Sequence, residues 1–209
     1  MPETGSDIVV EGWSQRYARA FAHLLGIEGG HVNDPVDRGG ETKYGISLRF
    51  LRVEGAFDED GNGRPDFDLD MDGDIDGADI RLLTIGDARY LYLKCFWMPL
   101  GCDGLPMPIG EILFDQAVNG GAFAARKLLQ RAINLCLARM GESLITVDGR
   151  IGPDTLDAMT FVLAKRGMTA LIEACRVAAA DRYRLIAQRY PSQKRFLKGW
   201  LRRAERLGR

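Results

Sequence analysis

The chain has 209 residues, of which 46% are apolar and 27% charged, enough for one compact domain or two small ones. No stretch reaches the roughly 18 apolar residues of a membrane span, and the N-terminus lacks a basic and then apolar signal segment. We therefore expect neither membrane insertion nor signal-directed secretion. The net charge of −1 conceals an asymmetry, because residues 58–79 hold ten carboxylates against one arginine.

The spacing of apolar residues predicts a first helix over residues 13–27, followed by Glu28-Gly29-Gly30. A carboxylate at the end of an apolar helix, beside two glycines, lies where burial can raise a carboxyl pKa and where backbone can approach a ligand closely. These are the properties of a general acid, so Glu28 is a candidate catalytic residue. The alternative is that Glu28 only caps neighbouring backbone and that the glycines only make turns.

The loop after this helix combines polar side chains with flexible glycine pairs. Its carboxylates and hydroxyls are Asp34, Asp37, Glu41, Thr42 and Tyr44. Together with the preceding glutamate, they indicate a cleft that cleaves or binds carbohydrate.

Residues 68–79 have the register of an EF-hand calcium loop. Gly73 stands at its position 6, where such a loop turns sharply, and Ile75 stands at its position 8, which is usually apolar. The predicted metal ligands are the aspartates of this segment: Asp68, Asp70, Asp72, Asp74, Asp76 and Asp79. Because so many carboxylates repel one another, we expect a structural Ca²⁺ and a segment that is ordered with the ion and loose without it. The alternative is a solvated acidic loop.

Two details bear on this metal site. Asp79, at position 12, is shorter than the usual glutamate, which favours a lower affinity. A second loop of the same kind begins upstream with oxygen ligands at Asp58, Asp60 and Asn62. Its position 12 is Leu69, so a complete second site is not expected, and the upstream oxygens could instead add ligands to a neighbouring ion.

The rest of the chain is helical in pattern, and alternating β patterns are nearly absent. Thr84 is a candidate helix N-cap. The predicted helices cover residues 79–97, 109–118, 122–139, 153–165, 168–189 and 193–206. Proline and glycine punctuate residues 99–108, which indicates two regions, 1–105 with an acidic insertion at about 56–80, and 106–209.

Cysteine, histidine and basic residues narrow the choice of partners. The cysteines have no metal-type spacing, so we expect mostly buried thiols in a protein made in a reducing compartment. With only His23 and His31, a zinc site is not expected.

Residues 182–209 hold ten basic side chains and one carboxylate. This patch could attract nucleic acid or an anionic polymer such as a bacterial wall, or it could be a solvated helix face. No known nucleic-acid motif accompanies it, so no specific nucleic-acid partner is expected.

Several motifs follow one another in a fixed order. The first region carries Glu28-Gly29-Gly30, then Asn33-Asp34-Pro35, then the run from Asp37 to Ile46. This series resembles glycoside hydrolase family 108, whose members are phage endolysins and related bacterial muramidases, although His31 stands where the family often has tyrosine. The second region is similar to the predicted peptidoglycan-binding domain that follows in that family, through these runs: Phe114–Gly121, Leu129–Ala132, Asp148–Leu156 and Phe196–Leu201.

The resemblance implies an all-α, lysozyme-like fold that hydrolyses the β-1,4 bond between N-acetylmuramic acid and N-acetylglucosamine in peptidoglycan glycan strands. It makes Glu28 the catalytic acid, which protonates the glycosidic oxygen. Asp37 is the first choice for the second carboxylate, and Glu41 is the second choice. Thr42 and Tyr44 are candidates for positioning the water or the sugar, against a purely structural role.

Two residues of the second region are further candidates. Asp115 and Asn119, four residues apart on one helical face, either line the same cleft from the second region or form a buried polar pair that ties the two regions together.

Ca²⁺ is expected to hold the insertion in place and fix one wall of the cleft, without a catalytic role. A lytic transglycosylase and a non-catalytic wall-binding or secretion-assisting module stay open as alternatives. We expect a monomer, made in the bacterial cytoplasm, that reaches the wall after holin-mediated or other release.

Overall fold

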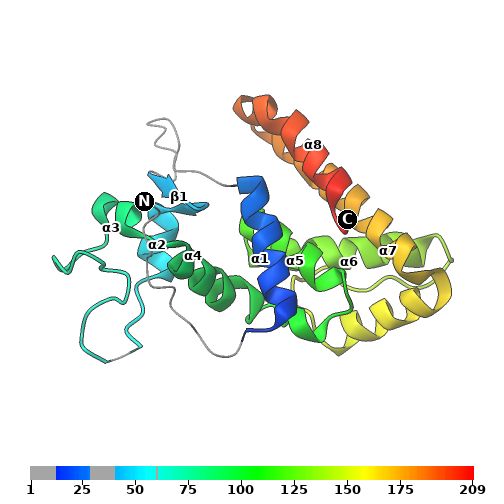
Figure 1. Cartoon of the computed structure of the whole chain (residues 1–209). Helices are drawn as coiled ribbons and strands as arrows, with labels where there is room; N and C mark the ends of the chain where they lie inside the picture. The colour runs from blue at the N-terminus through cyan, green and yellow to red at the C-terminus, as the bar shows by residue number, and fades with distance from the viewer. Residues whose placement is uncertain (1–12, 29–40, 60) are drawn as a thin grey trace. The chain divides into compact units, whose positions relative to one another are not determined.

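The computed structural model describes residues 13–28, 41–59 and 61–209, except for the side chains of Ile27 and Glu28 (Figure 1). The chain divides into two compact units, residues 1–99 and 100–209. Within the described ranges the regular structure is helical apart from one hairpin of two short strands, which confirms the expected all-α fold. Residues 55–59 and 61–76 of the first unit form neither helix nor strand. None of these helices is long and apolar enough to cross a membrane.

The elements of each unit follow the chain in a simple order. The first unit contains α1 (Gln15–Glu28), β1 (Thr42–Lys43), β2 (Ile46–Ser47), α2 (Leu48–Glu54), α3 (Gly77–Leu82), α4 (Ile85–Tyr92) and the π-helical η1 (Leu93–Trp97). The second unit contains two 3₁₀ segments and four α-helices, namely η2 (Cys102–Gly104), α5 (Ile109–Gly120), α6 (Ala122–Ala138), α7 (Pro153–Arg189), η3 (Pro191–Phe196) and α8 (Leu197–Arg206).

The first unit has an aromatic core. Tyr17 and Phe21 of α1 contact Trp97 of η1 and Tyr92 of α4, with ring centroids 5.3 and 5.9 Å apart. All four side chains are at most 2% exposed. Since burial of one large apolar side chain contributes roughly 1.5–3 kcal/mol, this cluster fixes α1 firmly onto α4.

A short β-hairpin leads into α2. Its strands pair antiparallel, and the turn between them has positive φ at Tyr44 and Gly45, 52° and 77°. Positive φ at both central residues is the pattern of a type I′ turn, whose twist matches that of the paired strands. Ser47 ends the hairpin and caps α2, because its hydroxyl oxygen accepts from the backbone N–H of Phe50.

In the second unit, α6 contacts both α5 and α7, and α8 packs on α7. The core between them includes Leu113, Phe114 and Ile133, each at most 2% exposed. Helix α7 consists of two helical stretches that meet at Gly167, whose φ of 78° glycine adopts without steric cost. Figure 1 shows the change of direction within α7, and the predicted division between residues 165 and 168 is confirmed.

The two units carry opposite net charge. Residues 1–99 contain 10 basic and 19 acidic residues, a net charge of −9. Residues 100–209 contain 18 basic and 10 acidic residues, a net charge of +8. The near-neutral chain is therefore a pair of strongly charged units.

Candidate functional site

Helix α1, through its middle residue Phe21, and the hairpin turn both contact one buried side chain. Tyr92 lies in ring contact with Phe21 of α1, and its hydroxyl donates to the carbonyl oxygen of Tyr44 at 3.1 Å. Glu28 is the last residue of this helix. The side chain of Glu28 and the whole of Asp37 lie outside the described residues. The first unit thus holds two of the predicted cleft segments, α1 and the hairpin, on the same support.

Glu41 is the candidate for the second carboxylate that the structure does describe. Its side chain is 11% exposed and accepts from Arg81 of α3 at 2.8 Å. Its backbone oxygen accepts from the N–H of Leu48 at 3.0 Å, which closes the hairpin. Both the backbone and the side chain of Glu41 are therefore fixed where the hairpin begins.

Thr42 and Tyr44 lie within the hairpin itself. Thr42 is the partner of Ser47 across the two strands, and both Thr42 and Tyr44 are half-buried. The ammonium group of Lys43 lies 5.5 Å from the centroid of the Tyr44 ring. The hairpin thus offers a hydroxyl, an aromatic ring and a cation within three consecutive residues.

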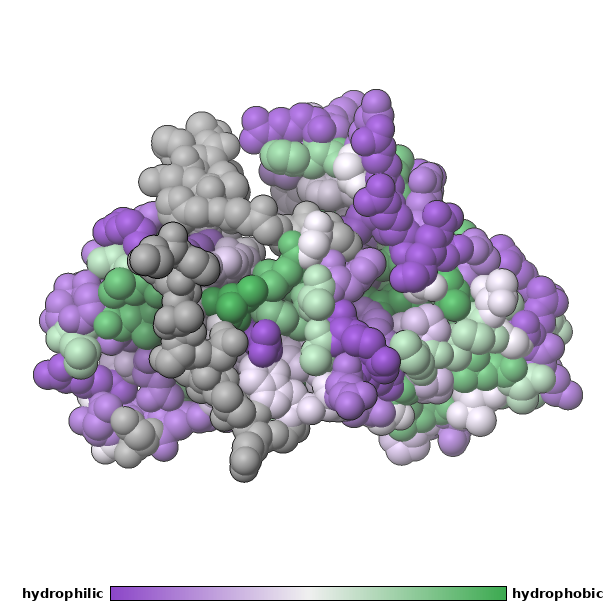
Figure 2. All heavy atoms as spheres, viewed as in Figure 1, coloured by the Kyte–Doolittle hydropathy of each residue, from purple (hydrophilic) through white to green (hydrophobic). Residues whose placement is uncertain are grey.

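The acidic loop, residues 68–79, folds around two buried aspartates. Asp68, 6% exposed, accepts from the backbone N–H groups of Asp72 and Gly73 at 3.1 and 3.0 Å. Asp79, 1% exposed, accepts from the N–H of Leu69 at 2.6 Å. Gly73 has a φ of 105°, in agreement with the sharp turn predicted at this position. Figure 2 shows hydrophilic side chains over this part of the first unit.

Three of the six predicted metal ligands come together in this loop. Asp68, Asp70 and Asp79 each offer an oxygen, and these oxygens lie within 4.8 Å of one another. Desolvation, followed by the neighbouring carboxylates, raises the pKa of Asp70. Asp76 instead caps α3, because its carboxylate accepts from the N–H of Ala78 at 2.5 Å. The group does not include the remaining predicted ligands, Asp72, Asp74 and Asp76.

The segment upstream repeats the same turn. Asp58 accepts from the backbone N–H groups of Asn62 and Gly63 at 3.1 and 2.8 Å, four and five residues further along the chain. These are the spacings that Asp68 uses in the next loop. Asp60 lies among the residues that the structure does not describe. The repeated turn supports the prediction that a second loop of the same kind begins at Asp58, upstream of the loop that begins at Asp68.

Asp115 and Asn119 of α5 face a cation of α8. Arg203 donates to both carboxylate oxygens of Asp115, at 3.0 to 3.3 Å. The two side chains are 13% and 16% exposed. With its amide oxygen turned toward Arg203, Asn119 accepts from the same guanidinium. The structure thus joins both predicted residues to a partner within the second unit, and their place along the cleft stays a prediction.

A second polar cluster organises the segment after α6, and its centre, Gln130, was not among the predicted site residues. Gln130, 1% exposed, donates to the Asp148 carboxylate and the Arg150 carbonyl oxygen at 2.8 and 2.9 Å. Its amide oxygen accepts from Gly149 N–H at 2.8 Å. Gly149 has a φ of 81°, and a Cβ there would lie 2.6 Å from the ring of Phe123, so a larger residue at this position would be strained. Gln130 lies in one of the motifs that carried the family resemblance. A buried side chain that must both donate and accept hydrogen bonds explains the choice of glutamine at this position.

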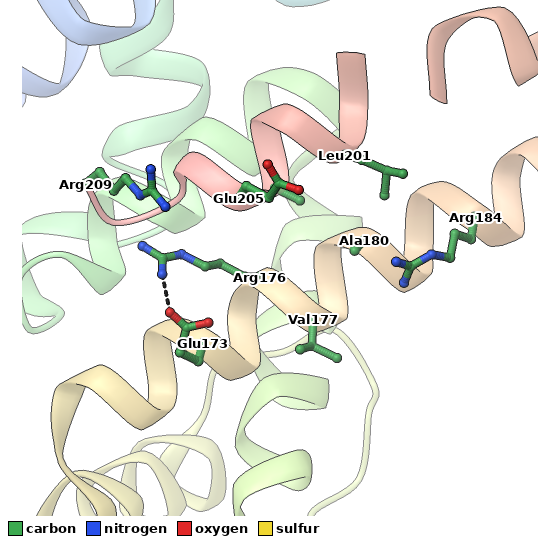
Figure 3. A pocket seen from close by; sticks show the side chains of 9 residues that line it. Glu173, Arg176, Val177, Ala180, Arg184, Leu201, Glu205 and Arg209 are labelled. Atoms are coloured by element: carbon green, nitrogen blue, oxygen red, sulfur yellow. Dashed lines mark hydrogen bonds and ion pairs between the residues drawn. The ribbon is translucent and has the colours of Figure 1, made fainter. Parts of the chain in front are cut away.

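A groove of about 370 Å³ is lined by α7 and α8 (Figure 3). Val177 and Leu201 give it an apolar lining, and the guanidinium groups of Arg176, Arg184 and Arg209 give it positive charge. The guanidinium of Arg176 pairs with Glu173. Glu173 and Glu205 also line the groove, and Arg184 pairs with Asp181, so its lining carries charges of both signs.

Comparisons with known proteins agree with this geometry. Residues 21–121 match the family model of glycosyl hydrolase 108, and residues 124–205 match that of a predicted peptidoglycan domain. The chain is similar to the solved structure of Brucella abortus SagA, with a TM-score of 0.58 and 25% sequence identity over 92% of this chain and 95% of that one. A search of curated proteins found no match. A segment that matches glycosyl hydrolase 108 is thus followed by a segment that matches a predicted peptidoglycan domain, and this combination identifies the chain as a peptidoglycan hydrolase.

Proposed function

We propose that this protein is an N-acetylmuramidase, which hydrolyses the β-1,4 bond between N-acetylmuramic acid and N-acetylglucosamine. Glu28 acts as the general acid and protonates the glycosidic oxygen while positive charge builds on the sugar ring. The observation that carries the proposal is the shared anchoring of α1, which ends at Glu28, and of the hairpin turn on Tyr92. A glycosidase needs this rigidity, because its acid must be held in a fixed position relative to the groups that orient sugar and water.

For the second carboxylate we propose Asp37, which stabilises the cationic ring or orients the attacking water. The ion pair between Glu41 and Arg81 supports this choice, because it gives Glu41 a partner within the protein. Thr42 and Tyr44 position the water or the sugar from the hairpin, a role that agrees with their place on a well-anchored turn.

The test is the clearing of purified peptidoglycan, with mass spectrometry of the products. The wild type is expected to release reducing muramic ends, and Glu28→Gln is expected to be slower by about 10²–10⁴-fold, the usual contribution of a general acid. Glu54→Gln, which changes an exposed carboxylate at the end of α2, is the matched control and should clear like the wild type.

Other products would identify the alternatives. Anhydro-muramoyl ends in place of reducing ends would mean a lytic transglycosylase that uses Glu28 as its single acid. Binding to peptidoglycan without any clearing by the folded protein would mean a non-catalytic wall-binding module.

We also propose that the acidic loop binds one structural Ca²⁺ through Asp68, Asp70 and Asp79. Oxygen ligands lie about 2.3–2.6 Å from Ca²⁺, so ligands of one ion are at most about 5 Å apart. The three oxygens meet this limit, since they lie within 4.8 Å of one another. The ion would supply the positive charge that crowded carboxylates need, and it would tie Asp79 of α3 to the start of the loop.

Removal of calcium tests this proposal through stability. Added Ca²⁺ should raise the melting temperature above its value in EGTA, and a concentration one hundred times the Kd should add about 2.7 kcal/mol to the free energy of unfolding. Asp70→Asn should weaken this gain without harming the fold, because Asp70 is exposed. Asp157→Asn, on an exposed position of α7, should keep the full gain. Equal melting temperatures with Ca²⁺ and with EGTA would contradict the proposal.

A further inference from the structure

Helix α3 holds the start of the β-hairpin through contacts on both sides of Thr42. Arg81 donates to Glu41 Oε2 at 2.8 Å, and its own carbonyl oxygen accepts from Lys43 Nζ at 2.5 Å. Glu41 and Lys43 are the two neighbours of Thr42 in the chain. One residue of α3 therefore contacts the hairpin with both its side chain and its backbone.

Gly77, the first residue of α3, makes room for this contact. A Cβ at Gly77 would lie 2.8 Å from Glu41 Oε2 and 3.2 Å from a terminal guanidinium nitrogen of Arg81. The carboxylate thus lies directly against the backbone of α3, in the space that a side chain at Gly77 would occupy. Because this carboxylate ends a flexible side chain, a methyl group at Gly77 would displace the carboxylate and leave the helix in place.

The ion pair contributes little to stability. The side chain of Arg81 is 59% exposed, and pairs with a solvent-exposed partner typically contribute less than about 1 kcal/mol. Its geometry is nevertheless tight, because Glu41 is 11% exposed and is held by α3 and by the Leu48 N–H. A contact of this kind fixes a position without determining whether the unit folds.

We propose that Arg81 and Gly77 fix the Glu41 carboxylate and, through it, the hairpin that carries Thr42 and Tyr44. Arg81 is then a positioning residue for the cleavage of peptidoglycan, supplied by a helix that lies beyond the cleft motif in sequence. The inference rests on the muramidase function proposed above. A displacement of about 1 Å in a catalytic site can lower a rate on the order of 10²-fold, so partial loss of this support should lower kcat about tenfold.

The experiment compares variants of the full chain on soluble glycan-strand oligomers, with kcat, KM and melting temperature measured for each. Arg81→Ala removes the guanidinium, and Gly77→Ala keeps every charge but displaces the carboxylate. Both should lower kcat about tenfold while KM and melting temperature stay near the wild-type values, and Arg81→Lys should recover part of the loss. The matched control is Lys94→Ala, which breaks another ion pair of the first unit, Lys94 with Glu59, whose side chains are 43% and 42% exposed.

A double variant tests whether Arg81 acts through Glu41. Glu41→Gln should lower kcat by a similar factor, and adding Arg81→Ala should lower it no further, because both changes remove the same contact. If the wild type cleaves and the Arg81 and Gly77 variants match Lys94→Ala in kcat, the inference alone is overturned. A wild type that releases no product, or a fully active Glu28→Gln variant, overturns the proposed function and this inference with it.

Discussion

Asp148 shows how a single hydrogen-bonded carboxylate makes the stability of the second unit depend on pH. The hydrogen bond from Gln130, followed by that from the backbone N–H of Arg150, lowers the pKa of Asp148 below 3.8. A pKa that is lower in the folded than in the unfolded state stabilises the protein above the unfolded value. This contribution is lost as the pH falls through the folded pKa.

The corresponding prediction concerns Asp148→Asn. The wild type should be more stable than this variant above about pH 4, and the difference should shrink as the pH is lowered below that value, because the variant has no proton to bind at this position. Thermal unfolding of the full chain over a series of pH values from neutral to acidic is the measurement. Asp157→Asn, at an exposed position, should follow the wild-type pH dependence; two parallel curves for wild type and Asp148→Asn would refute the linkage.

Single residues were also where sequence reasoning reached its limit. It selected Asp115 and Asn119 from their spacing, yet it gave no reason to choose Arg203 as their partner, which lies 88 residues beyond Asp115. Arg203 is one of ten basic residues in the C-terminal segment, and nothing local marks the one that turns inward. Pairings between distant side chains depend on how helices pack, and the local spacing of apolar residues does not predict which helices pack together.

At the scale of elements, the long helices were predictable and the short elements were not. The predicted helices at 122–139 and 109–118 agree closely with α6 and α5, since each buries an apolar face over several turns. Thr84 was correctly predicted as an N-cap, and it caps α4. The hairpin strands have two residues each, too few to show an alternating pattern, although Ser47 before Leu48 was an available N-cap signal for α2.

A prediction at this scale concerns the tie between α5 and α8. Arg203→Ala should lower the free energy of unfolding by about 2–3 kcal/mol, because it leaves the mostly buried carboxylate of Asp115 without its cationic partner and with only the Gln116 amide as a donor among the described residues. Arg184→Ala, which breaks an exposed pair with Asp181 on α7, should cost less than about 1 kcal/mol. Denaturant unfolding of the two variants is the measurement, and similar losses from both would mean that burial does not strengthen the α5–α8 pair.

For the whole molecule, the excess positive charge of the second unit bears on binding to the wall. Because the net charge of +8 lies in the unit that matches the peptidoglycan domain, attachment to an anionic wall should have an electrostatic part. The amount of protein that sediments with purified peptidoglycan should fall as salt is raised, since exposed charges are screened beyond about 10 Å at 0.1 M. Arg202→Gln with Arg206→Gln, at two exposed positions of α8, should reduce the salt dependence, whereas Lys94→Gln in the first unit should not. If the amount of wild-type protein that sediments with peptidoglycan does not change with salt concentration, this electrostatic contribution is ruled out.

The opposite charges of the two units also govern how the purified protein behaves as a solute. A sequence pI of about 6.2 suggests a weakly charged molecule, but it results from the cancellation of −9 against +8. At neutral pH such a chain should adsorb to anion-exchange resin through one unit and to cation-exchange resin through the other. In concentrated, salt-poor solutions the acidic unit of one molecule should attract the basic unit of the next, so buffers of moderate ionic strength are the ones in which single molecules are expected to prevail.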